Sequence, residues 1–276
     1  MKSGLRRALL LGRRRPRLSG AGSPTAIRGD GYEFVELREY VAGDDPRRID
    51  WAATARAGAL QTRVVLEDVA LTLAAIVDHS ESMRLGRRRA LTIAAQEAIQ
   101  TWYSAAETDD RCIRITGRGV YAPPGLRGPR SALVCSNVEG EEPFVLRDVL
   151  EAARCALPLG SALLVISDFF ELTNDFNALL HRLPQRYDCT VLIARDPWFN
   201  DLPLRGFVTM QDAEKKAQCR VFVGAHERDR YLRAVREREG ALRRRFENAG
   251  WRTGILREED GEGSLLAAFG IPSTIA

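Results

Sequence analysis

Short apolar runs alternate with amphipathic stretches along most of this sequence. The runs at residues 71–77 and 162–167 are almost continuously apolar, which is typical of strands buried on both faces of a parallel sheet. Between such runs, apolar residues spaced three and four positions apart predict helices. Strands are predicted at residues 60–66, 71–77, 112–116, 120–122, 132–135, 162–167, 189–194, 207–210, 219–223 and 251–256. Helices are predicted at residues 46–56, 88–105, 145–157, 173–183, 227–248 and 264–269.

This order of elements predicts a fold class. Strands that alternate with helices favour a doubly wound, mostly parallel, Rossmann-like α/β sheet. A chain of 276 residues is long enough to bury the core of one such domain. We predict three parts: a basic flexible arm over residues 1–30, an N-terminal segment over residues 31–68 that packs on the sheet domain, and the α/β domain over residues 69–276.

The first predicted helix has recognisable ends. Ordered structure is expected to begin near residues 32–40. Asp45 then suits the N-cap of a helix and Pro46 its first position, because proline fits where no backbone donor is needed. The helix is predicted to run to about Arg56, and Gly58 favours its end.

The basic charge of the chain is concentrated at its start. The net charge is +4, but residues 1–29 alone carry +8 with no acid, so residues 30–276 sum to −4. Such a tail suits contact with nucleic acid or an anionic membrane surface, although a solvated arm is the simpler interpretation. Leu9-Leu10-Leu11 is too short for a signal-peptide core, and no apolar run is long enough to span a bilayer. We therefore expect no transmembrane segment.

Five cysteines are scattered along the chain without a C-x-x-C pair. This spacing argues against a zinc site and against a disulfide framework. Cys112, Cys155 and Cys189 stand in apolar runs, so they are predicted to be buried free thiols. Free thiols are typical of a reducing compartment, and a cytoplasmic location is expected.

Oxygen-bearing side chains follow two of the predicted central strands. Asp78, Ser80 and Ser82 alternate directly after the run that ends at Val77, and Asp168 follows the later run. In open α/β sheets, ligands bind beyond the carboxyl ends of the strands, where the strand order reverses. If the two strands are neighbours, the four side chains share one edge and suit a hard cation such as Mg²⁺. Asp and Ser at a strand-to-helix junction are also ordinary helix caps, so the Asp-x-Ser-x-Ser pattern alone is weak evidence for a metal site. The second acid, Asp168, strengthens the metal interpretation.

A long motif precedes this region. Residues 31–51 read GYEFVELREYVAGDDPRRIDW, and Ala55-Arg56 follow. Together with residues 71–83 and 163–168, this motif resembles the fifty-eighth bacterial family of domains of unknown function. Members of that family have a von Willebrand factor A-like domain, and their genes commonly lie beside those of MoxR-type AAA ATPases.

The resemblance implies a fold, a site and a partner. It implies a von Willebrand factor A-like sheet with a metal-ion-dependent adhesion site that holds Mg²⁺, Mn²⁺ or Ca²⁺. Asp78, Ser80 and Ser82 match its first-loop ligands and Asp168 its last-loop acid. A complete site also uses a threonine from a middle loop, where residues 123–140 offer only Ser131 and Ser136. The resemblance implies a non-enzymatic adaptor that engages a protein partner, a MoxR-type ATPase.

The motif itself alternates acids and bases. Four arginines are interleaved with five carboxylates between residues 36 and 56. Because arginine pairs with carboxylates in a fixed bidentate geometry, a structural brace against the sheet domain is favoured over a surface for a partner.

Two other functions stay open. The first is a metal-dependent phosphohydrolase, since an aspartate at a strand end can accept a phosphoryl group. Ser80 stands where such enzymes place a second acid, the three histidines are scattered, and no Walker loop or Gly-x-Ser-x-Gly elbow is present. The second is binding of nucleic acid or a membrane surface through the arginine-rich tail, which should weaken steeply with salt.

Overall fold

The computed structural model describes residues 2–13, 33–41, 44, 46–66, 70–107, 110–116, 119–121, 144–213 and 217–272. The chain divides into two compact units. The sheet unit comprises Met1–Leu18 and Leu71–Ala276, and the small unit comprises Ser19–Ala70. The predicted strand at 132–135 lies outside the described residues.

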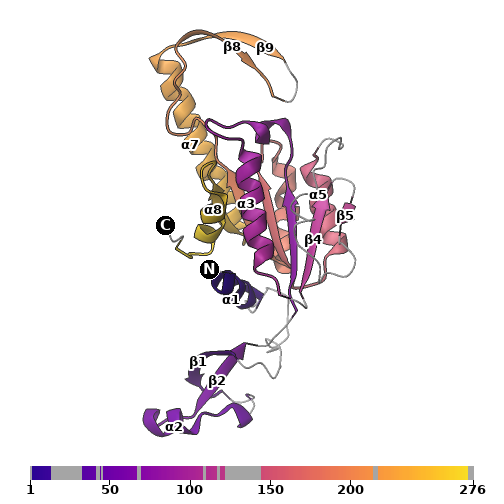
Figure 1. The fold of residues 1–276 in the computed structure, drawn as a ribbon, viewed down its shortest axis with the longest axis vertical. Coiled ribbons are helices and arrows are strands. Elements are labelled where there is room, and N and C mark those ends of the chain that lie inside the picture. Colours follow the sequence, from indigo (N-terminus) through magenta and orange to yellow (C-terminus); the bar gives the residue numbers. More distant parts are fainter. Residues whose placement is uncertain are drawn as a thin grey trace. The chain divides into compact units, whose positions relative to one another are not determined.

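A six-stranded sheet forms the centre of the sheet unit, with the order β10-β7-β6-β3-β4-β5 (Figure 1). Five of its strands are parallel and the short edge strand β5 is antiparallel to β4. The α/β class and the mostly parallel sheet predicted from the sequence are confirmed. The strands are β3 (Thr72–Val77), β4 (Arg111–Thr116), β5 (Gly119–Tyr121), β6 (Ala162–Ser167), β7 (Asp188–Ala194) and β10 (Arg252–Leu256).

Helices cover both faces of this sheet. Side chains alternate across a strand, so Ala74 and Ile76 of β3 face one core while Leu73 and Ala75 face the other. The first core is closed by α5, α6 and α7, and the second by α3 and α8, which pack on each other. The helices are α3 (Leu91–Ser104), α5 (Leu146–Ala156), α6 (Asn177–Arg182), α7 (Ala225–Asn248) and α8 (Gly261–Ala268). Short 3-10 turns are η2 (Glu81–Arg84), η3 (Asn174–Phe176) and η4 (Leu183–Gln185).

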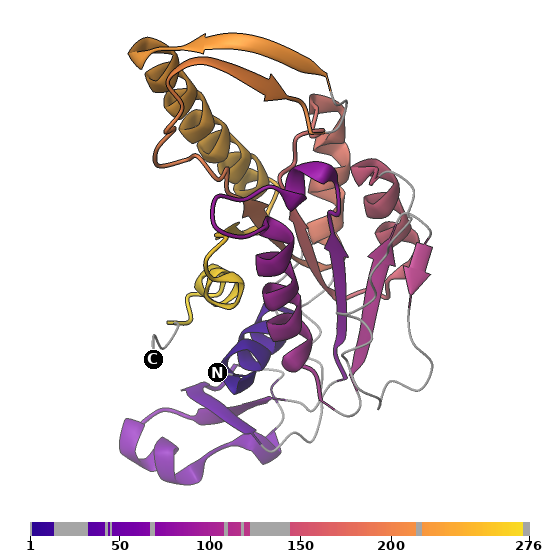
Figure 2. The same ribbon diagram turned by 45° about the horizontal axis from the view of Figure 1, so that its top comes forward.

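An antiparallel ribbon extends beyond the sheet. It consists of β8 (Gly206–Gln211) and β9 (Gln218–Val223) and leads into the long helix α7. Figures 1 and 2 show it on the side toward which the parallel strands point. Phe207 and Phe222 are cross-strand partners with rings 5.2 Å apart, yet they are 69% and 56% exposed.

The start of the chain differs from the predicted arm. Residues Lys2–Arg13 form helix α1, in which Leu5, Leu9 and Leu10 are buried. The arginine-rich composition suggested a solvated segment, but the apolar residues gather on one helical face that packs within the sheet unit. The flexible-arm prediction is therefore wrong for residues 2–13, and residues 14–30 lie outside the described part.

The small unit contains β1 (Glu33–Glu39), η1 (Pro46–Arg48), α2 (Trp51–Ala57) and β2 (Gln61–Leu66), with β1 antiparallel to β2. The single helix predicted over residues 46–56 is interrupted, because Ile49 bridges to Thr62 of β2. Asp50 is the N-cap of α2, accepting a bond from the Ala53 amide at 2.9 Å, whereas the predicted cap Asp45 lies outside the described residues. The predicted end at Gly58 is confirmed by its left-handed φ of 70°.

Cysteine burial follows the prediction in part. Cys112 and Cys189 are buried free thiols, whereas Cys155 is exposed, so its predicted burial is wrong. Cys155 lies near the end of the amphipathic helix α5, on the side away from the core, where an apolar neighbourhood in sequence does not imply burial. Within the described residues, no helix combines the length and apolarity needed to cross a membrane.

Candidate functional site

The two strands that end in predicted site residues are neighbours. β3 and β6 run parallel, with Val77 opposite Ile166, and the Asp78 amide donates to the Ile166 carbonyl at 2.9 Å. From β3 the chain moves to β4 on one side and then returns to β6 on the other, so the strand order reverses between β3 and β6. The carboxyl ends of these strands therefore form the topological switch point, where ligands bind in open α/β sheets.

Asp78 is a buried carboxylate at this switch point, with only 4% of the residue exposed. One oxygen, Oδ1, accepts the backbone N–H of Ser80 at 2.8 Å, and the other, Oδ2, accepts the Ser167 hydroxyl at 2.6 Å. Burial raises the pKa of Asp78 above its ordinary value, although the bonds from Ser167 and Ser80 oppose that shift. No arginine, lysine or histidine among the described residues forms an ion pair with this carboxylate.

The hydroxyls of Ser80 and Ser82 lie side by side, with their Oγ atoms 2.9 Å apart. Ser80 occupies the N-cap position of η2, but its side chain makes no capping hydrogen bond. This separation is that of a hydrogen bond between the two hydroxyls, and it is also close to the roughly 3.0 Å between adjacent ligands of an octahedral Mg²⁺ at about 2.1 Å. The sequence alternative of an ordinary helix cap does not describe Ser80.

Asp168 completes the set of predicted residues. Its Oδ1 accepts the Phe170 amide at 2.9 Å, while its Oδ2 accepts no hydrogen bond from any described residue. The charge of Asp168 is close enough to contribute to the raised pKa of Asp78. The fold thus brings all four predicted residues to one sheet edge, Asp78, Ser80 and Ser82 after β3 and Asp168 after β6.

This donor set suits a hard divalent cation. All four side chains offer oxygen, which Mg²⁺ prefers, and the buried carboxylate of Asp78 lacks a positive partner among the described residues. In the described part of the chain, no group of three or more His, Cys, Asp or Glu side chains could hold a metal. The candidate cation site therefore consists of two carboxylates and two hydroxyls. Ser131 and Ser136 of the expected middle loop lie outside the described residues.

Three further residues organise the site and were missed by sequence reasoning. Ser167, 2% exposed, donates to Asp78 and accepts the Phe169 amide at 2.9 Å. Phe169 has a φ of 56°, the left-handed region that non-glycine residues rarely adopt. Arg238 of α7 donates from Nη2 to the Asp168 carbonyl at 2.8 Å. The serine directly before Asp168 was a usable signal, but no local pattern reveals an arginine 70 positions away.

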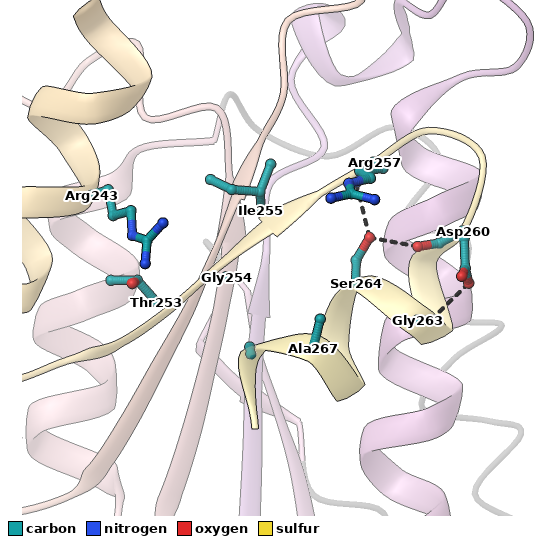
Figure 3. A pocket seen from close by; sticks show the side chains of 10 residues that line it. Arg243, Thr253, Gly254, Ile255, Arg257, Asp260, Gly263, Ser264 and Ala267 are labelled. Atoms are coloured by element: carbon teal, nitrogen blue, oxygen red, sulfur yellow. Dashed lines mark hydrogen bonds between the residues drawn. The ribbon is translucent and has the colours of Figure 1, made fainter. Parts of the chain in front are cut away.

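A cavity of about 290 Å³ lies elsewhere, between β10, α8 and the end of α7 (Figure 3). Its polar groups bind one another. The Ser264 hydroxyl donates to the Asp260 carbonyl and accepts the Arg257 amide, and Asp260 caps α8 through the Gly263 amide at 2.7 Å. Arg243 pairs with Glu247 at 2.7 Å. This cavity is lined by none of the strand-end site residues, and its contacts are those of a structural junction.

Fold and site together define a class, an α/β protein with an oxygen-lined edge at the switch point of a mostly parallel sheet. The model of the family described as "Protein of unknown function DUF58" matches residues 36–241, well over half of the chain. The chain belongs to this family, and the resemblance inferred from the sequence is confirmed.

The chain is similar to curated proteins of two Mycobacterium species. Uncharacterized protein Mb1516 of Mycobacterium bovis and Uncharacterized protein Rv1480 of Mycobacterium tuberculosis are each 29% identical to it over 236 residues, covering 81% of this chain and 74% of theirs. Among solved structures, the conserved hypothetical protein BatB from Bacteroides thetaiotaomicron is similar over 66% of this chain and 99% of its own. Its TM-score of 0.37 and identity of 11% carry no argument about this chain.

Proposed function

We propose that this chain is a non-catalytic, von Willebrand factor A-like binding module of the cytoplasm. In this proposal, Asp78, Ser80, Ser82 and Asp168 hold a divalent cation, Mg²⁺ or else Mn²⁺ or Ca²⁺, at the end of β3 and β6. The cation supplies a coordination position for an acidic side chain of a protein partner, and the partner is a MoxR-type AAA ATPase.

One observation carries the metal part of the proposal. Asp78 is 4% exposed, its carboxylate has no cationic side chain beside it in the described chain, and a second carboxylate lies near it. Buried charges in proteins are paired or coordinate metals, because leaving one alone costs several kcal/mol. A bound cation would satisfy Asp78 and relieve its repulsion from Asp168.

The competing functions have weaker support. A phosphohydrolase of the kind considered needs a second acid where this chain has Ser80, whose hydroxyl lies 2.9 Å from that of Ser82. Arg6 of the N-terminal tail forms ion pairs with Asp110 and Glu107, so its charge is already engaged within the protein. Binding of nucleic acid or lipid through the tail would have to do without it. The tail alternative makes no use of the four oxygen-bearing side chains at the β3–β6 edge.

The test is binding to the MoxR-type ATPase encoded in the same genome, measured by biolayer interferometry in Mg²⁺ and in EDTA. We expect binding in Mg²⁺ that falls at least about tenfold in EDTA, and an equal loss for the double variant Asp78→Ala with Ser80→Ala. Asp229→Ala on the exposed side of α7 removes an acid outside the site and is the matched control.

Two results would count against the proposal. Binding that persists in EDTA and in the double variant would remove the cation from the mechanism. Turnover of generic phosphate esters that is lost in Asp78→Asn would replace the adaptor with an enzyme.

A further inference from the structure

The chain makes a turn after Asp168, in which the Leu172 amide donates to the Phe169 carbonyl at 3.2 Å. Phe169 adopts a left-handed backbone with φ 56°, a conformation that costs a side-chain-bearing residue on the order of 1–3 kcal/mol. The turn is fixed from inside, because the Phe169 ring is buried 4.8 Å from the Phe246 ring and its amide donates to Ser167. As a result, two successive phenylalanines have opposite environments, and Phe170 is 79% exposed.

Phe170 is held in place although it faces solvent. Its amide donates to Oδ1 of Asp168 at 2.9 Å. The guanidinium of Arg238 lies 4.5 Å from the centre of its ring, and the same guanidinium donates to the Asp168 carbonyl at 2.8 Å. A large aromatic surface is thus fixed two residues from a candidate metal ligand. Because this side chain is already ordered, it would lose little conformational freedom when a binding partner covers it.

The charge beside this ring indicates what covers it. Arg238 forms no ion pair with a carboxylate among the described residues, since its partners there are the Asp168 carbonyl and the Phe170 ring. A cation bound between Asp78 and Asp168 would balance those two carboxylates, and the positive charge of Arg238 would then lie against the ring without a carboxylate partner in the described chain. An acidic segment is therefore the complementary partner, and arginine with an aromatic residue is the composition of an interface hot spot.

We propose that Phe170, positioned by Arg238, is the apolar anchor for an acidic protein segment whose carboxylate completes the cation site. The proposal rests on the adaptor function above and adds the chemistry of the partner. The segment presents an apolar side chain to Phe170 and a carboxylate beside it. Phe170 sets affinity by direct contact, whereas Arg238 is a positioning residue.

The experiment uses the same ATPase in Mg²⁺ with Phe170→Ser. Phe207→Ser is the matched control, because Phe207 is also an exposed phenylalanine, 69% accessible, with the Arg220 guanidinium 5.1 Å from its ring centre, but it lies on the β8–β9 ribbon. We expect Phe170→Ser to weaken binding at least about tenfold and Phe207→Ser less than about twofold. Arg238→Met should weaken binding to a smaller extent, and Arg238→Lys should restore part of the loss.

A second readout separates this inference from the adaptor function. Titration of Mn²⁺ into Phe170→Ser should give wild-type affinity, because Phe170 contributes only its amide to the site. Wild-type ATPase binding by Phe170→Ser overturns the anchor while the adaptor proposal stands, provided that Asp78→Ala with Ser80→Ala still loses binding. Loss of Mn²⁺ binding in Phe170→Ser would show that Phe170 maintains the structure of the cation site, and this would overturn its role as an anchor. If the wild-type protein does not bind the ATPase, both proposals are overturned.

Discussion

Two buried aspartates lie at opposite ends of the same sheet. Asp110, 3% exposed, precedes β4 and accepts the amides of Leu71 and Glu107 at 2.6 and 2.7 Å, with the Arg6 guanidinium as its ion-pair partner. Asp78, 4% exposed, follows β3 and has hydroxyl and amide donors but no cationic side chain in the described chain. The first carboxylate has a cationic partner within the protein, whereas the second has none among the described residues, and we propose that a bound cation supplies it.

The difference shows how to recognise a site in this fold. The cavity at the junction of β10 and α8 is lined by polar groups that satisfy one another. Unbalanced charge points instead to the β3–β6 edge, where the topology also places ligands. The balance of each buried charge is the more informative observation.

The same substitution at both aspartates should have opposite effects, and the larger effect belongs to Asp110. Asp110→Asn leaves the Arg6 side chain, 12% exposed, without its buried partner. Breaking a buried pair from one side costs about 3–5 kcal/mol when the partner is lost completely, so we expect the free energy of unfolding to fall by about 3 kcal/mol. Urea unfolding measures it, and an unchanged free energy of unfolding would show that Asp110 is not a structural ion pair.

Cation binding should stabilise the protein in a pH-dependent manner. The pKa of Asp78 is raised in the folded, metal-free protein, so its contribution to stability is complete below the ordinary carboxyl pKa and is lost as pH rises through the raised value. Mg²⁺ binds the deprotonated form, so its stabilisation should grow over the same range, reaching about 2.7 kcal/mol at one hundred times Kd. Thermal unfolding with and without Mg²⁺ between pH 4.5 and 8 measures this. A Mg²⁺ shift that is equal at all pH values would contradict the role of Asp78.

Asp78→Asn should stabilise the metal-free protein. The substitution removes a buried charge while it keeps an oxygen that accepts a hydrogen bond, and we expect a gain of about 1 kcal/mol in EDTA together with loss of the Mg²⁺ response. Urea unfolding of both proteins in EDTA is the measurement. Destabilisation comparable to that of Asp110→Asn would mean that the two aspartates are equivalent.

The smallest effect is expected at Glu107. Its carboxylate is 59% exposed and pairs with Arg6 at 3.0 Å, so solvent screens the interaction. Glu107→Gln should change the free energy of unfolding by less than about 0.5 kcal/mol, and this variant controls for the loss of any acid near Arg6. A loss as large as that of Asp110→Asn would assign the stabilisation to the exposed pair instead.

Sequence reasoning succeeded where the signal was local. Continuous apolar runs located β3 and β6, and the residues that follow them placed Asp78 and Asp168 at strand ends. The sequence did not show that β3 and β6 are neighbours, and the structure confirms that they pair. The four candidate side chains could therefore be identified from sequence, while their shared edge required the topology.

The failures have physical reasons too. In α1, arginine content outweighed the apolar spacing of Leu5 and Leu9, although that spacing is the signal of a packed helical face. The helix predicted over residues 46–56 is divided into η1 and α2, because the pairing of Ile49 with β2 interrupts it. The contact of Arg238 with Asp168 depends on tertiary packing, which no local pattern encodes.

The central claim is that the β3–β6 edge holds one divalent cation through Asp78. Titration of Mn²⁺ followed by electron paramagnetic resonance tests it without any partner protein. The account predicts one bound Mn²⁺ per chain, displaced by Mg²⁺ and absent from Asp78→Ala with Ser80→Ala. Equal Mn²⁺ binding by the wild type and the double variant, or no binding by either, would contradict it.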